Sequence, residues 1–345
     1  MKTESLYFEN PRKIKIREEN LQEPGENQVQ VRTLFSAISS GSEMLVYRGL
    51  MPDSMETDVG IKSLSGEMKY PMKYGYSAVG QVMSTGKKGD PSWVGKRVFV
   101  FHPHQRQFVS DLDQVFEIPD DLDDTDALFF PNMESAISFV MDGRPLPGEM
   151  VVIFGLGVVG LLTTAVLSKY PLLRLIAVDP IPLRREHALT MGAAKAISPQ
   201  SPEFSLMGKY SENKHDYSGN PPAGADLIFE LSGNPEALNI AVNSIGYNGR
   251  IVVGSWYGRK HASLELGGRF HRSQAGIISS QVSRISPKLS GRWSKKRRFD
   301  LVWDILKLIR PSKLITHSFD FYDAVQAYRM LDENPGETIQ VILKY

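Results

Sequence analysis

Three glycines and an acid are spaced so that they could bind a dinucleotide. Gly155, Gly157 and Gly160 lie in VVIFGLGVVG, between an expected buried strand and an expected helix. In this G-x-G-x-x-G spacing the glycines allow a tight turn, a close approach to a pyrophosphate and helix–sheet packing. Asp179 follows about twenty residues later and could accept hydrogen bonds from both ribose hydroxyls of NAD.

The acid also bears on the choice of cofactor. Asp179 would repel the 2′-phosphate of NADP, whereas Arg184 and Arg185 follow soon after and could bind a phosphate instead. We therefore expect NAD rather than NADP. Further cofactor residues are expected at the helix start and at two later strand ends, because strand C-termini line the ligand crevice of open α/β sheets. They are Val158, Val159, Glu230, Ser232, Gly233, Gly254 and Ser255.

A second group of candidates surrounds the segment SAISSGSEMLVYRG, residues 36–49. Small hydroxyl residues, a glycine, an acid and Arg-Gly in this order are typical of loops that carry chemistry. The segment FHPHQRQF adds His104, a candidate acid–base group because imidazole titrates near neutral pH. His102, His104 and Glu134 could be imagined as metal ligands. Because Pro103 lies between the two histidines and no further ligand is assured, we do not expect a metal site here. For His102 alone, an ordinary packed histidine is the better interpretation.

The pattern of the chain predicts two domains that position these residues. The first third alternates apolar and polar residues between Gly and Pro breakers, as in NQVQVRTLF and YSAVGQVMSTG, which predicts a β-rich, barrel-like domain. Over residues 121–282, apolar runs such as MVVIF and DLIFEL alternate with helical stretches, which predicts a parallel sheet wrapped by helices. The polar segment 198–224 is expected to be a surface excursion. The helix FDLVWDILKLIR and the strand TIQVILKY return the chain to the first domain, so we expect divisions at 1–120, 121–282 and 283–345.

The composition restricts the classes of function. The 345 residues include 40 Lys and Arg against 39 Asp and Glu, a net charge of +1, which argues against a nucleic-acid partner. The absence of cysteine excludes disulfides, thiolate nucleophiles, iron–sulfur clusters and a four-cysteine zinc lobe. No secretory signal is visible, and the apolar run VVIFGLGVVGLLTTAVL is shorter than the ~20 residues of a membrane span. We expect a cytoplasmic protein with no membrane partner.

The whole chain resembles the medium-chain dehydrogenase/reductase superfamily in its β-rich N-terminal domain, Rossmann domain and short C-terminal return. The resemblance implies an α/β fold with a GroES-like catalytic domain and a doubly wound parallel sheet, and it implies a homodimer. Zinc-dependent members have Cys-Gly-Thr/Ser-Asp where this chain has SGSE, residues 40–43, and Gly-His-Glu where it has GYS, residues 75–77. Their third ligand falls near Glu134.

This comparison implies a zinc-free branch. Ser40 and Tyr76 replace two of the three ligands, and neutral hydroxyls are poor ligands beside thiolate and imidazole. Glu134 alone cannot hold the ion, so we expect no bound zinc. The segments AISSGSEMLVYRG, FVFHPHQRQFV and GRFHRSQAGIISSQVS look most like the group around bacteriochlorophyllide dehydrogenases, which oxidise a secondary alcohol on a large planar ring with NAD.

Without zinc, hydrogen-bond donors must stabilise the charge that develops on a substrate oxygen, and some group must move its proton. The resemblance makes Ser42 the first candidate, because it matches the Ser/Thr relay position, although the histidine that usually ends the relay is Leu45 here. Tyr76 could donate a proton, accept one, or only pack. For Glu43 a structural role is the better interpretation, since the matching acid lies behind the zinc ligands. His104 and Glu134 complete the catalytic candidates.

We therefore predict a zinc-independent, NAD-dependent oxidoreductase that transfers a hydride between the nicotinamide and a small-molecule secondary alcohol or ketone. One alternative is an NADPH-dependent quinone or enoyl reductase, against which Asp179 argues. Another is a catalytically inactive dinucleotide-binding sensor, against which the retention of Ser42, Tyr76 and His104 argues. The sequence names neither the substrate nor the direction of the reaction.

Overall fold

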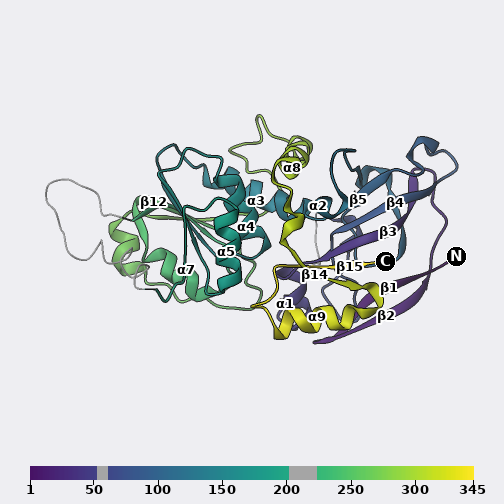
Figure 1. The fold of residues 1–345 in the computed structure, drawn as a ribbon, viewed down its shortest axis with the longest axis horizontal. Coiled ribbons are helices and arrows are strands. Elements are labelled where there is room, and N and C mark those ends of the chain that lie inside the picture. Colours follow the sequence, from purple (N-terminus) through teal and green to yellow (C-terminus); the bar gives the residue numbers. More distant parts are fainter. Residues whose placement is uncertain (53–60, 202–223) are drawn as a thin grey trace. The chain divides into compact units, whose positions relative to one another are not determined.

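The structure is a computed structural model that describes residues 1–52, 61–201 and 224–345 (Figure 1). The chain divides into two compact units: Met1–Pro131 with Asp300–Tyr345, and Asn132–Phe299. Both changes of unit fall within helices, α3 (Phe130–Gly143) and α8 (Lys295–Ile309). Most of the segment expected to be a surface excursion lies outside the described residues.

The first unit is built on a mixed β-sheet. In the described part of the chain its strand order is β14-β15-β3-β4-β5-β7, β6 also pairs with β3, and β1 and β2 form a separate antiparallel hairpin. The strands are β1 (Lys2–Asn10), β2 (Lys13–Asn20), β3 (Gln28–Ile38), β4 (Ala78–Thr85), β5 (Arg97–Val100), β6 (Gln107–Asp111), β7 (Val115–Glu117), β14 (Ile315–Asp320) and β15 (Gln340–Lys344). The helices are α1 (Ser42–Tyr47), α2 (Asp124–Ala127) and α9 (Ala324–Glu333).

Alternating side chains bury one face of this sheet. Val29 and Val31 of β3 are fully buried and pack with Val98 and Phe108 from β5 and β6. This period of two is the pattern that a half-buried strand requires. The C-terminal strand β15 pairs antiparallel with β3, so the end of the chain belongs to the first unit.

The second unit is a parallel sheet with helices, and it confirms the predicted Rossmann architecture. Its six strands follow the order β10-β9-β8-β11-β12-β13 within the described residues. They are β8 (Met150–Phe154), β9 (Arg174–Val178), β10 (Lys195–Ile197), β11 (Ala225–Glu230), β12 (Ile245–Val253) and β13 (Gly276–Ser279). The helices are α4 (Val158–Leu167), α5 (Pro182–Thr190) and α7 (Pro235–Val242).

The strand order reverses at β8, which fixes where a ligand can bind. The chain runs outward from β8 through β9 to β10, then returns to place β11 on the other side of β8. Open α/β sheets bind ligands at such a switch point, outside the strand C-termini. The ends of β8 and β11 therefore bring Gly155 and Ser232 together.

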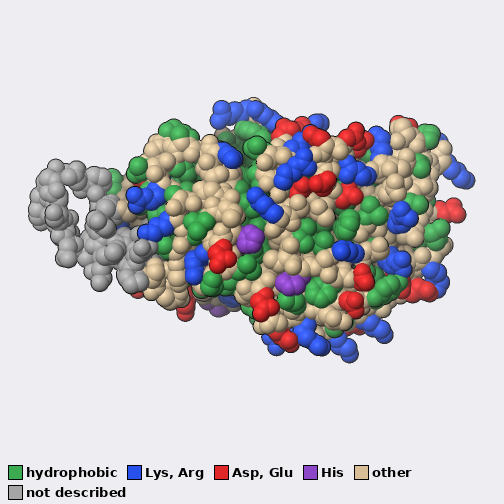
Figure 2. Space-filling view, viewed as in Figure 1, with side chains coloured by type: hydrophobic (Ala, Val, Ile, Leu, Met, Phe, Trp, Pro, Cys, Tyr) green, Lys and Arg blue, Asp and Glu red, His purple; other side chains and the backbone are tan. Residues whose placement is uncertain are grey.

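The helices and the surface charge of the structure both agree with the composition. In the described residues, no helix is both long enough and apolar enough to cross a membrane, and the run VVIFGLGVVGLLTTAVL is divided between β8 and α4. On the face drawn in Figure 2, basic and acidic side chains are interspersed, as the net charge of +1 suggests.

Candidate functional site

The turn between β8 and α4 is tight at two glycines and open at the third. Gly155 has a φ of +88°, and a Cβ there would lie 2.4 Å from the backbone of Ser232. A Cβ at Gly160 would lie 1.9 Å from the carbonyl oxygen of Gly155, whereas no atom lies within 4 Å of one built at Gly157. The three positions thus suit a sharp turn, close helix packing and the approach of a pyrophosphate. That phosphate group would meet the N-terminus of α4, which begins with Val158 and Val159.

Asp179 follows β9 and is held against this turn. It is only 3% exposed, and its Oδ2 accepts a hydrogen bond from the Leu156 N–H at 2.8 Å while Oδ1 accepts one from the Ile181 N–H at 2.8 Å. Each carboxylate oxygen keeps a second lone pair for a ribose hydroxyl. Arg184 Nη1 lies 3.8 Å from Oδ2, so this arginine is oriented toward the carboxylate. The geometry fits NAD.

The ends of β11 and β12 carry the remaining predicted cofactor residues. Glu230 is fully buried and accepts hydrogen bonds from the Ser232 N–H at 2.9 Å and from Tyr257 Oη at 2.5 Å. Burial, together with this carboxylate, raises the pKa of Tyr257. The Gly233 N–H donates to Ser255 Oγ at 2.9 Å.

Gly254, at the end of β12, packs close to these residues. Its N–H donates to the Glu230 carbonyl at 3.0 Å, and a Cβ there would lie 2.5 Å from the Phe139 ring. The structure therefore brings the four predicted residues of these strand ends together, with Glu230 as the group that orders them.

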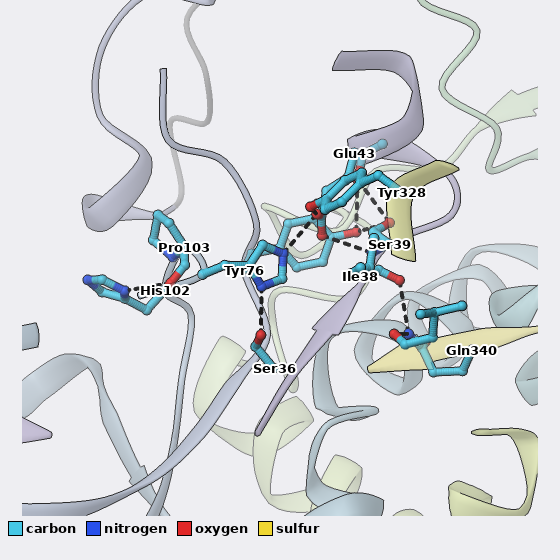
Figure 3. Close-up of polar contacts among 12 residues, drawn as sticks. Ser36, Ile38, Ser39, Glu43, Tyr76, His102, Pro103, Tyr328 and Gln340 are labelled. Atoms are coloured by element: carbon cyan, nitrogen blue, oxygen red, sulfur yellow. Dashed lines mark hydrogen bonds and ion pairs between the residues drawn. The ribbon is translucent and has the colours of Figure 1, made fainter. Parts of the chain in front are cut away.

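In the first unit, three hydroxyls meet where β3 gives way to α1. Tyr76 Oη donates to Ser39 Oγ at 2.7 Å (Figure 3). Ser42 Oγ donates to Ser39 Oγ at 3.0 Å and lies 3.0 Å from Tyr76 Oη. The structure thus joins two predicted residues, Ser42 and Tyr76. Sequence reasoning missed Ser39, whose signal was its spacing three residues before Ser42 across a helix start. We name Ser39, Ser42 and Tyr76 the hydroxyl cluster.

A buried contact between Glu43 and His104 anchors the loop that carries this cluster. Glu43 is fully buried, and its Oε1 accepts the Ser39 N–H at 2.8 Å. Its Oε2 lies 2.9 Å from His104 Nε2 and also accepts a hydrogen bond from Tyr328 Oη of α9 (Figure 3). Burial raises the pKa of Tyr328, and the Glu43 charge adds to this effect. Glu43 therefore links the Ser39 backbone to His104 and Tyr328.

His104 lies inside the same network. It is fully buried, and its Nδ1 lies 2.7 Å from Ser36 Oγ, which in turn lies 2.8 Å from Tyr345 Oη. Since Nε2 contacts Glu43, both ring nitrogens are engaged. In this geometry His104 reaches the hydroxyl cluster through Glu43 rather than directly.

Gly75 brings the loop of Tyr76 onto this histidine. Its φ is +116°, and a Cβ there would lie 2.8 Å from His104 Nε2. A side chain at this position would be both strained and in collision. The glycine therefore sets how closely the Tyr76 loop approaches the buried pair.

The other two candidates have different surroundings. Glu134 belongs to α3 in the second unit, is 4% exposed, and accepts a hydrogen bond from the buried Arg298 of α8. Arg298 also donates to Ser138 Oγ at 2.9 Å. His102 stacks on Phe108 with ring centroids 3.7 Å apart, and burial lowers its pKa to about 3. These are the surroundings of a packed, neutral histidine.

Zinc does not fit the groups at the positions of the expected ligands. Ser40 is a neutral alcohol, the Tyr76 hydroxyl is bonded within the cluster, and the Glu134 carboxylate is neutralised by Arg298. Over residues 1–52, 61–201 and 224–345, no three His, Cys, Asp or Glu side chains are grouped as a metal site.

Known proteins share both the sequence pattern and the fold. Residues 158–291 match the family model described as zinc-binding dehydrogenase. D-guloside 3-dehydrogenase of Escherichia coli strain K12 is 24% identical over 91% of this chain and 92% of its own length. The starvation-sensing protein RspB of the same strain is 24% identical over 99% of both chains. The crystal structure of the short chain alcohol dehydrogenase (rspB) from E. coli CFT073 with NADH superposes with a TM-score of 0.78, at 22% identity, over 100% of this chain and 99% of that one.

These similarities show which proteins the chain is related to. The chain has the two-unit α/β fold of the dehydrogenase structure that it superposes on, and its full-length relatives include a dehydrogenase. The matched model places residues 158–291 with zinc-binding dehydrogenases. The zinc-free branch and the nearest group within it stay predictions.

Proposed function

We propose that this protein is an NAD-dependent oxidoreductase that interconverts a secondary alcohol and its ketone without a bound metal. The observation that carries the proposal is the hydroxyl cluster, which contains Tyr76, a residue at a position where the sequence resemblance implies a zinc ligand in zinc-dependent relatives. The glycine turn and Asp179 support NAD as the cofactor. When bound, the nicotinamide accepts a hydride from the alcohol carbon or returns it to the ketone.

The protein's own groups must then manage the charge and the proton on the substrate oxygen. The hydroxyl cluster, which includes the predicted Ser42 and Tyr76, supplies a hydroxyl group that can donate to this oxygen or exchange a proton with it. Glu43 and His104 hold the loop through the Ser39 N–H, and we assign them a positioning role. Glu134 is neutralised by Arg298, so we assign it the same kind of role in the second unit.

The substrate class follows from two sources that differ in detail. The name of D-guloside 3-dehydrogenase supports oxidation of a ring secondary alcohol on a sugar derivative. The resemblance of the loop segments to bacteriochlorophyllide dehydrogenases favours a secondary alcohol on a larger planar ring. Both are secondary alcohols, and we propose that class, acted on by a homodimer.

The direct test is a substrate screen with both cofactors. Purified protein is mixed with NAD or NADP and a panel of glycosides, polyols and aryl secondary alcohols, and reduced nicotinamide is followed by its absorbance. We expect turnover with at least one secondary alcohol and a preference for NAD. Reduction of quinones or enones with NADPH, without alcohol oxidation, would favour the reductase alternative. Tight NAD binding with no turnover on any panel member would favour a dinucleotide-binding sensor.

A further inference from the structure

Ser39 accepts hydrogen bonds from both other members of the hydroxyl cluster. Tyr76 Oη donates to Ser39 Oγ at 2.7 Å (Figure 3), and Ser42 Oγ donates to it at 3.0 Å. A serine hydroxyl has two lone pairs and one proton. Two donors fill both lone pairs of Ser39 and leave its proton unused within the cluster.

The third contact decides whether Ser39 accepts one hydrogen bond or two, but in each arrangement the Ser39 proton stays unused within the cluster. Ser42 Oγ and Tyr76 Oη are 3.0 Å apart, and either can be the donor. If Ser42 donates to Tyr76 and Tyr76 donates to Ser39, the three hydroxyls form a chain that ends at Ser39. If both donate to Ser39 directly, Ser39 is again the end. In the part of the chain that the structure describes, the Ser39 hydroxyl donates to no protein group.

We propose that Ser39 is the catalytic residue whose hydroxyl contacts the substrate oxygen, and that Ser42 and Tyr76 act through it. This inference rests on the proposed function, because it names the proton-exchanging group of the same site. A hydroxyl that accepts two hydrogen bonds is polarised, so the hydrogen bond that it donates is strengthened. The cluster thereby concentrates partial positive charge on one proton, which is the stabilisation that a developing oxyanion needs.

Protons and electrons balance both in ketone reduction and in alcohol oxidation. In ketone reduction a bound reduced nicotinamide would supply the hydride to the carbonyl carbon, and the oxygen would take the Ser39 proton. Ser39 regains a proton from Tyr76, and solvent restores the phenol. In alcohol oxidation these transfers are reversed, so that one hydride goes to the oxidised dinucleotide and one proton goes to solvent.

The backbone of Ser39 is held independently of its hydroxyl. Its N–H donates to Glu43 Oε1 at 2.8 Å, and Glu43 is fixed by His104 and Tyr328. The substitution Ser39→Ala removes the hydroxyl and keeps this anchor. It therefore tests the chemistry of the side chain rather than the position of the loop.

The experiment compares three alanine variants with the wild type on the alcohol found in the screen. We expect Ser39→Ala to lower kcat about 10²- to 10³-fold, the usual cost of losing one oxyanion donor. Ser42→Ala should lose less, and Ser40→Ala, which removes an adjacent hydroxyl outside the cluster, should stay near wild type. Ser39→Thr keeps a hydroxyl and should retain more activity than Ser39→Ala.

A binding measurement separates catalysis from loss of structure. A carboxamide imitates the ketone, and its affinity for the NADH-bound protein is read from the nicotinamide fluorescence. Ser39→Ala should weaken carboxamide binding at least about tenfold and leave NADH binding unchanged, because only the donor to the carbonyl is lost. If the alanine variant does not fold, Ser39→Cys replaces it and should show the same losses, since a thiol is a weak donor.

The outcomes distinguish this assignment from the proposed function. If Ser42→Ala loses as much as Ser39→Ala, or if Ser39→Ala keeps kcat within about threefold of wild type, Ser39 is not the donor although the enzyme is still a dehydrogenase. If the wild type binds no dinucleotide, the proposed function and the assignment both fail.

Discussion

The substitution Asp179→Ala tests the cofactor site, and its effect can be estimated from the geometry. The Asp179 carboxylate accepts the N–H groups of Leu156 and Ile181 and keeps lone pairs for the ribose hydroxyls. A hydrogen bond to a charged group contributes about 1.5–3 kcal/mol, and each 1.4 kcal/mol is about a factor of ten. Loss of the ribose contact should therefore raise the Kd for NAD about 10- to 100-fold.

The comparison with NADP isolates this contact from damage to the glycine turn. Because Asp179 also holds Leu156, the substitution loosens a turn that either cofactor would use, and this part of the effect cancels in the NAD-to-NADP ratio. Removal of the negative charge also ends its repulsion of a 2′-phosphate. We expect the apparent KM for NAD to rise and the preference for NAD over NADP to narrow by at least about tenfold, measured by titration of nicotinamide fluorescence and by steady-state kinetics. An unchanged ratio would refute the role of Asp179 in cofactor choice, even if both affinities fell.

Three further predictions concern the first unit. Ser42→Ala should lower kcat by more than about tenfold, because it removes one donor to the cluster, and turnover near wild type in steady-state assays would remove Ser42 from the mechanism. Gly75→Ala should lower the free energy of unfolding in urea by about 1–3 kcal/mol more than Gly66→Ala. Both glycines have positive φ, at +116° and +132°, but only a Cβ at Gly75 would collide with His104. Equal losses of unfolding free energy would contradict the close approach of Gly75 to His104. The pKa of His102 is about 3 in the fold against 6.5 in the unfolded chain, so the unfolded chain binds more protons between these values. The contribution of His102 to the free energy of unfolding is therefore constant above pH 6.5 and falls by about 1.4 kcal/mol per pH unit below it. In denaturation curves measured between pH 6 and about 4, His102→Phe should remove this part of the pH dependence. Equal pH dependence of the free energy of unfolding in the variant and the wild type would exclude this role of His102.

Local signals made the second unit predictable. The strand β8 coincides with MVVIF, and the glycine turn requires only residues that adjoin one another in the chain. A parallel strand that is buried on both faces appears as a continuous apolar run, which is hard to mistake. The alternation of such runs with helical stretches was therefore enough to predict the class of fold, and a ligand crevice at the strand ends follows from the rules of such sheets.

The hydroxyl cluster was only half predictable, because its members are distant in the chain. Ser42 and Tyr76 could be found by their positions in a family pattern, whereas Ser39 matters only because Tyr76, 37 residues away, donates to it. The Glu43 network joins residues even further apart, with Tyr328 lying 285 residues from Glu43. No spacing rule reaches across such separations.

Two further differences have simple physical causes. The hairpin of β1 and β2 was not foreseen, because the apolar alternation of KIKIREEN is confined to its first four residues and the rest is charged or polar. The helix α8 begins at Lys295, before the expected start, and so includes Arg298, a buried residue within a run of cations. Its burial depends on the Glu134 carboxylate, a partner 164 residues away.

The most direct test of the account is the metal content of active enzyme. Protein dialysed against a strong chelator is assayed for alcohol oxidation with NAD, and zinc and other transition metals are measured in the same sample by mass spectrometry. If hydroxyl groups stabilise the reacting oxygen, kcat is unchanged and far less than one metal ion per chain is present. One ion per chain in the untreated enzyme, with activity lost on chelation and regained on adding zinc, would contradict the account.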